Sequence, residues 1–132
     1  MSRRAQKPVL MSFYGRVLNP DMLTVYGIKQ CDTCRKALKW LEAQGVEHRF
    51  HDFRVDGLQS GVLQDWLGSP FADKLVNRRS TTWRQLTDAQ RLLQGQDLAQ
   101  LLLDNPTLIK RPVFVTDAIV AVGFNPQELT GL

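Results

Sequence analysis

The segment VYGIKQCDTCRKALKWLEAQG, residues Val25–Gly45, holds both cysteines of the 132-residue chain. Its first residues are β-formers that end at Gly27, which is typical of a buried strand. From Cys34 onward the apolar residues recur at helical spacing, and Gly45 suits the C-terminus of a helix. The segment therefore predicts a strand followed by a helix, with Cys31 and Cys34 on either side of the helix start.

The residues on both sides of this segment continue the alternation of strands and helices. A strand that starts at Met22 and a second strand over residues 46–55 flank the helix, and a short helix is expected over residues 60–68. A strand, a helix and a second strand indicate a parallel crossover unit. Residues 69–105 read as helices and loops, including a helix that starts at a Thr or Asp cap in TDAQRLLQ and a helix that ends before Pro106.

The C-terminal part predicts a hairpin and one more helix. The β-rich runs Val113–Val115 and Ile119–Val122 are joined by a tight connection, and Asn125 followed by proline is typical of a helix start. Pro112 precedes the first run, where it has no N–H to donate to a sheet, and a cis bond after Arg111 is expected. A Cys-x-x-Cys motif and such a proline indicate a thioredoxin-like α/β fold.

Length, composition and charge predict one domain, residues 22–132, preceded by a basic leader. The net charge is +4, but residues 1–21 carry +3 of it, so the body is nearly neutral. Arg78, Arg79 and Arg84 form the one basic group in the body, which does not favour nucleic-acid binding. We expect residues 1–21 to be a dispensable extension, disordered or not native, with Met22 as the functional start.

Neither secretion nor membrane anchoring is expected. The leader has only a short apolar run, Val9 to Met11, which is too brief for a signal sequence or a membrane span. Two cysteines are also too few for a secreted disulfide framework. These observations favour a cytoplasmic location and a chemical role for the pair.

The cysteines have three interpretations. A zinc site with His48 and His51 has suitable spacing, but two histidines three residues apart on a strand face opposite ways, so we expect no metal. As buried apolar residues, Cys34 fits the helix core face and Cys31 does not. As a reactive pair, the thiol at the helix N-terminus is held as thiolate by N–H groups and the helix dipole. Cys34 is then either a resolving thiol or a spectator.

Three motifs together carry a family resemblance: YGIKQCDTCRKAL, KRPVFVT and VGFNPQEL. Residues 22–132 resemble the arsenate reductase (ArsC) and Spx-like family, which has a thioredoxin fold, a mixed four-stranded sheet with flanking helices, with a helical insertion. The nearest branch is that of the YffB-like proteins, proposed glutathione-dependent thiol reductases. The resemblance implies that Cys31 is the nucleophile and Arg111 binds an anion. Asn77 and Asn125 stand where arsenate reductases have further arginines, for which Arg78 or Arg79 could compensate.

The leading expectation is a thiol–disulfide oxidoreductase with glutathione as co-substrate, docked against Arg111 and Pro112, since guanidinium pairs bidentately with carboxylate. Its substrate would be a small-molecule or protein disulfide. The alternative implied by the resemblance is an Spx-like redox regulator that binds RNA polymerase. Arsenate reduction ranks third because of Asn77 and Asn125.

Overall fold

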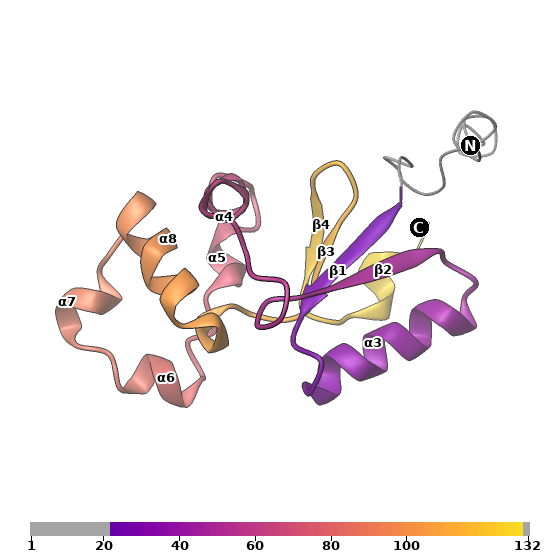
Figure 1. Ribbon diagram of the computed structural model, residues 1–132, viewed down its shortest axis with the longest axis horizontal. Coiled ribbons are helices and arrows are strands. Elements are labelled where there is room, and N and C mark those ends of the chain that lie inside the picture. Colours follow the sequence, from indigo (N-terminus) through magenta and orange to yellow (C-terminus); the bar gives the residue numbers. More distant parts are fainter. Residues whose placement is uncertain (1–21, 131–132) are drawn as a thin grey trace.

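A four-stranded sheet with the order β2-β1-β3-β4 lies at the centre of the computed structural model, which describes residues 22–130 (Figure 1). The strands are β1 (Leu23–Gly27), β2 (His48–Asp52), β3 (Val113–Val115) and β4 (Ile119–Val122). β1 pairs with β2 in parallel and with β3 in antiparallel orientation, and β3 and β4 form the antiparallel hairpin. The mixed sheet and the crossover predicted from the sequence are confirmed.

Each face of the sheet has its own core, because side chains alternate along a strand. Leu23 and Val25 of β1 pack with Phe114 of β3 in the core on the side of α3 (Asp32–Ala43). Val113 of β3 joins the core on the opposite side, which the insertion helices cover. Figure 1 accordingly shows α3 on one side of the sheet and helices α4 to α8 on the other.

The insertion consists of five helices, most of them short. They are α4 (Ser60–Leu67), α5 (Ala72–Leu75), α6 (Thr81–Arg84), α7 (Asp88–Arg91) and α8 (Gly95–Asp104), followed by the 3-10 turn η2 (Pro106–Leu108). Thr87 caps α7 through a reciprocal pair of hydrogen bonds with Gln90, so the predicted cap is confirmed. An antiparallel bridge between Val76 and Ile109 ties the insertion to the chain that enters β3.

Two elements differ from the prediction. The second strand ends at Asp52, not Val55, because the Asp52 carboxylate accepts the N–H groups of Arg54 and Val55 and turns the chain. The C-terminal helix is the 3-10 turn η3 (Pro126–Leu129), in which the Glu128 N–H bonds three residues back to the Asn125 carbonyl.

The structure bears on the expected N-terminal extension and on the expected lack of a membrane span only through residues 22–130. Residues 1–21, expected to be a dispensable extension, lie outside the described residues. Among residues 22–130, no helix has the length and apolar character needed to cross a membrane.

Candidate functional site

Cys31 lies in the loop between β1 and α3, at the N-cap of the helix. Its backbone is extended, with φ −86° and ψ 125°, and its carbonyl accepts the Arg35 N–H at 3.0 Å. The residue is partly exposed, and it also packs against the core on the side of the insertion. The predicted position of the two cysteines around a helix start is confirmed.

The surroundings of Cys31 favour the thiolate. Partial burial raises the pKa of the thiol, but the backbone N–H groups of Cys34 and Thr33, the Arg111 guanidinium and the Cys34 thiol together outweigh burial, so the pKa is lowered. The thiol makes no capping hydrogen bond of standard geometry, so the N–H groups act on it as the positive end of the helix dipole.

The charged residues next to Cys31 in the sequence stabilise its thiolate less than the guanidinium of Arg111 does. Arg35 pairs with Asp32 at 3.1 Å on the surface, so their opposite effects on the thiolate largely cancel. Its Nε and Nη2 atoms also donate to the carbonyls of Lys29 and Gln30, at 3.4 and 3.2 Å. Arg35 therefore braces the loop instead of facing the sulfur as a free cation.

Cys34 is a buried thiol on the core side of α3. It has no exposed surface, and burial is the main reason that its pKa is raised to about 11, with the Cys31 thiolate adding to the effect. Its sulfur packs against Gly27, where an added Cβ would lie only 2.5 Å from Sγ. At neutral pH Cys34 is thus a protonated neighbour of Cys31.

Gly27→Ala is expected to destabilise the protein by about 1–3 kcal/mol, the usual cost of overpacking a core. The reason is the close approach to the Cys34 sulfur, while the other neighbour, Phe50, stays at an ordinary 3.5 Å. Urea unfolding checks this value. In a Cys34→Ala background the same substitution should cost much less, and equal costs in the two backgrounds would contradict the explanation.

Arg111 comes from the segment just before β3, and its guanidinium is held by backbone carbonyls. Nη1 donates to the carbonyls of Thr107 and Ile109, at 3.4 and 3.2 Å, which anchors the group. Nε is buried and has no hydrogen-bond acceptor among residues 22–130. A buried N–H without an acceptor is costly, so an acceptor that reached Nε, either the nearby Cys31 thiolate or a ligand oxygen, would be bound favourably.

The backbone of Arg111 is also available. The Arg111–Pro112 bond is cis, as predicted, and Pro112 is fully buried before β3. Within the described part of the chain, no turn or loop hydrogen bond involves the N–H or the carbonyl of Arg111. These groups lie beside the sheet, where an extended ligand can pair with them.

Asn77 and Asn125 line one cavity of about 510 Å³, together with Arg79 and Lys110. Asn77 accepts the Arg79 N–H at 3.2 Å, and Asn125 caps η3 by accepting the Gln127 N–H. The cavity adjoins the Pro112 segment, since the N–H of Gly123, another lining residue, donates to the Pro112 carbonyl at 2.8 Å. Besides the two amides it is lined by four basic and two acidic side chains: Lys74, Arg78, Arg79, Lys110, Asp73 and Glu128.

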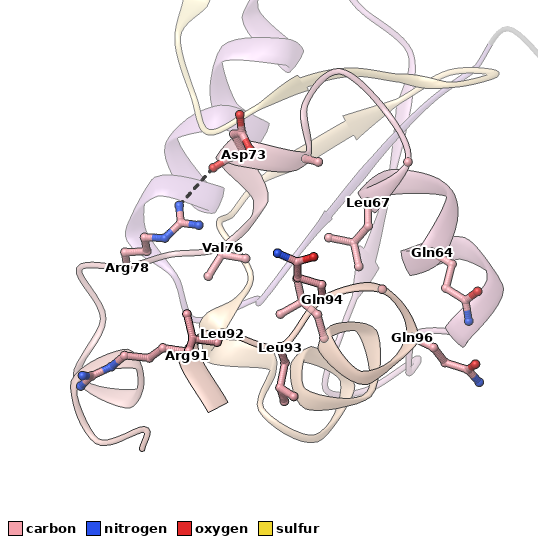
Figure 2. Close-up of a pocket in the computed structure, with 14 residues that line it drawn as sticks. Gln64, Leu67, Asp73, Val76, Arg78, Arg91, Leu92, Leu93, Gln94 and Gln96 are labelled. Carbon is pink, nitrogen blue, oxygen red and sulfur yellow. Dashed lines mark hydrogen bonds between the residues drawn. The ribbon is translucent and has the colours of Figure 1, made fainter. Parts of the chain in front are cut away.

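Arg78 also lines a second cavity, of about 570 Å³, within the insertion (Figure 2). Its Nη1 donates to the Asp73 carbonyl at 3.5 Å, and its guanidinium lies over the Trp83 ring. Figure 2 shows Leu67, Val76 and Leu93 around this space. Neither cysteine nor Arg111 is among the lining residues of this cavity or of the cavity of Asn77 and Asn125, and Arg78 lines both.

The histidines have backbone partners. His48 bonds the Val46 carbonyl at 2.8 Å, and His51 bonds the Gly57 carbonyl at 2.6 Å. In the part of the chain that the structure describes, no group of three His, Cys, Asp or Glu residues is placed to hold a metal ion.

Asp52 was not identified from the sequence. It lies at the end of β2 and is only 6% exposed, and its carboxylate accepts the Lys29 N–H, two residues before Cys31, at 2.9 Å. The one sequence signal is an acidic residue in the otherwise strand-like run FHDF. Lys110 was missed as well, because its place in the cavity depends on the pairing of residues 76 and 109.

Comparison with known proteins places this geometry in a family. The family model described as the ArsC family matches residues 26–132, which include both cysteines, Arg111 and Pro112. The chain belongs to the ArsC family. The resemblance predicted from the three motifs, and the thioredoxin-like fold with its insertion, are therefore confirmed.

Three relatives are similar to this ArsC-family chain over most of its length. An uncharacterized protein of Haemophilus influenzae is 48% identical over 108 residues, which cover 81% of this chain and 95% of that one. A solved structure named YffB is 35% identical with a TM-score of 0.72, covering 80% and 94% of the two chains. The global transcriptional regulator Spx of Listeria innocua is 28% identical over 110 residues, covering 82% and 84%. Membership in the family supports a thiol reductase or a regulator of the Spx kind.

Proposed function

We propose that this protein is a glutathione-dependent thiol–disulfide oxidoreductase in which Cys31 is the nucleophile and Arg111 binds a glutathione carboxylate. The observation that carries the proposal is the position of Arg111. Its guanidinium lowers the pKa of Cys31 and also has a buried Nε without an acceptor in residues 22–130. One residue thus favours the thiolate and receives the anionic group of the substrate.

The reaction consists of two exchanges. The Cys31 thiolate attacks the glutathione sulfur of a mixed disulfide, which forms a Cys31–glutathione disulfide and releases the other sulfur as thiolate. A second glutathione thiolate then attacks that disulfide, which releases oxidised glutathione and restores the Cys31 thiolate. The electron pair comes from glutathione, and the released substrate thiolate takes a proton from water.

The state of Cys34 favours a second glutathione over an internal resolving step. With a pKa of about 11 and no exposed surface, the Cys34 thiol is almost entirely protonated at neutral pH. A protonated thiol is a poor nucleophile toward a disulfide. Cys34 therefore acts chiefly as a neighbour whose S–H favours the Cys31 thiolate.

The test compares two mixed disulfides of one peptide, one with glutathione and one with 2-mercaptoethanol, which has no carboxylate. A charge-assisted bidentate contact of about 1.5–3 kcal/mol predicts that the glutathione disulfide is reduced about 10- to 150-fold faster. Glutathione is the reductant in both assays, and release of the peptide thiol is the readout. Equal rates, or turnover that does not depend on glutathione, would reject the proposal.

A second candidate is a redox-responsive regulator, favoured by the 28% identity with Spx over most of both chains. In that case the Cys31–Cys34 pair is a switch, and the partner expected from the resemblance is RNA polymerase. Capture of polymerase subunits by the reduced or the oxidised protein, with no turnover of mixed disulfides, would favour this candidate. Arsenate reduction ranks last because Asn77 and Asn125 carry no charge, and consumption of arsenate would be its test.

A further inference from the structure

The loop that carries Cys31 is tied to the end of the neighbouring strand by a buried carboxylate. Asp52, 6% exposed, ends β2 beside β1. Its Oδ2 accepts the N–H of Lys29 at 2.9 Å. Its Oδ1 accepts the N–H groups of Arg54 and Val55 at 2.7 and 3.3 Å. One side chain thus joins the β1–α3 loop to the turn after β2.

We propose that Asp52 is a positioning residue for Cys31. The hydrogen bond to Lys29 holds the loop so that the Cys31 sulfur faces the first N–H groups of α3 and the Arg111 guanidinium. This inference rests on the proposed function, in which Cys31 is the reactive thiol, and it adds a residue that does not touch the substrate.

The buried Ile28 side chain anchors the start of this loop, and the hydrogen bonds that hold the rest of it are local or exposed. The Cys31 N–H donates to the Ile28 carbonyl at 3.0 Å, which closes a tight turn but does not orient the turn against the sheet. Arg35 braces the loop from outside, yet its side chain is 55% exposed and its contact with the Lys29 carbonyl is 3.4 Å. Exposed contacts of this kind add little to the stability of the loop, whereas a buried charge-assisted hydrogen bond adds more.

The three N–H donors favour an ionised carboxylate. Burial raises the pKa of Asp52, but the N–H groups of Lys29, Arg54 and Val55 outweigh burial and lower it, so the group is charged at neutral pH. Asparagine has a single acceptor oxygen, and its NH2 group would face an N–H donor. Asp52→Asn therefore keeps the shape of the side chain but loses the contact on one side.

The experiment measures the pH dependence of Cys31 alkylation by iodoacetamide between pH 5 and 9 in the full-length chain, with mass spectrometry to identify the modified cysteine. For Asp52→Asn we expect the alkylation midpoint to rise by up to one unit, and the rate at pH 7 to fall by up to about tenfold. The matched control is Asp56→Asn, because Asp56 accepts the Asp52 N–H at 3.0 Å and, among residues 22–130, has no hydrogen bond to the Lys29 loop. This control should stay within about twofold of wild type.

The outcomes separate positioning from a role in stability alone. A folded variant in which the Lys29 amide exchanges faster than in wild type, while Cys31 keeps the wild-type midpoint, overturns the inference and leaves the proposed function intact. A wild-type Cys31 that titrates as an ordinary thiol overturns the proposed function itself. If Asp52→Asn does not fold, hydrogen exchange of the wild-type protein decides: slow exchange of the Lys29 amide supports the inference, and exchange at the rate of an unprotected loop amide overturns it.

Discussion

Cys31→Ser is expected to reduce the turnover of a glutathione mixed disulfide to the uncatalysed rate. A serine hydroxyl forms no disulfide, and the second thiol does not take over because Cys34 is buried with a pKa of about 11. At pH 7 a thiol of that pKa is thiolate in about one molecule in 10,000. Iodoacetamide should accordingly modify Cys31 alone in the wild-type protein at neutral pH. Turnover assays and peptide mapping of the alkylated protein check both statements.

The matched variant is Cys34→Ser, which should weaken activity by less than about tenfold, with loss of the S–H contact to Cys31 as the cause. Because a buried hydroxyl also costs stability, the assay needs conditions at which urea unfolding shows the variant to be folded. Equal and complete losses in the two variants would contradict the assignment and would indicate a dithiol reaction in which both sulfurs exchange.

The second large effect is expected for Arg111→Gln. The substitution removes a charge that lowers the pKa of Cys31, so the pKa should rise and the thiolate fraction at pH 7 should fall. It also removes the Nε edge proposed to bind the carboxylate, for which we expect about a 10- to 150-fold loss of kcat/KM with the glutathione disulfide. The advantage of that disulfide over the 2-mercaptoethanol disulfide should disappear.

Arg49→Gln is the control for net charge, because Arg49 lies on the edge strand β2, exposed, and donates to Thr24. Arg111→Lys adds a further comparison: it keeps the charge but loses the anchoring bonds to Thr107 and Ile109, so an intermediate rate is expected. Retention of the full glutathione preference in Arg111→Gln would show that the carboxylate binds elsewhere. The cavity lined by Asn77, Asn125 and Lys110 would then be the next place to test.

Several local features could be predicted because they are recorded in adjacent residues. The change from strand to helical periodicity between Gly27 and Cys34 predicted β1, α3 and the position of Cys31 at the helix start. The missing N–H of Pro112 predicted the entrance to β3. The end of β2 could not be predicted in this way, since the pattern up to Val55 is strand-like and the Asp52 carboxylate turns the chain first.

The sequence by itself therefore determined the order of the elements, the place of the two cysteines and the family. Only the tertiary structure showed how strongly the two thiols differ, because the burial that raises the pKa of Cys34 depends on the packing of α3 against Gly27. It also decided that Arg111, 80 positions away in the chain, reaches Cys31, and that Asp52 accepts the N–H of Lys29 in the loop that carries Cys31. The physical reason is that periodicity reports which face of an element is apolar, whereas charges and hydrogen bonds act between elements that only folding brings together.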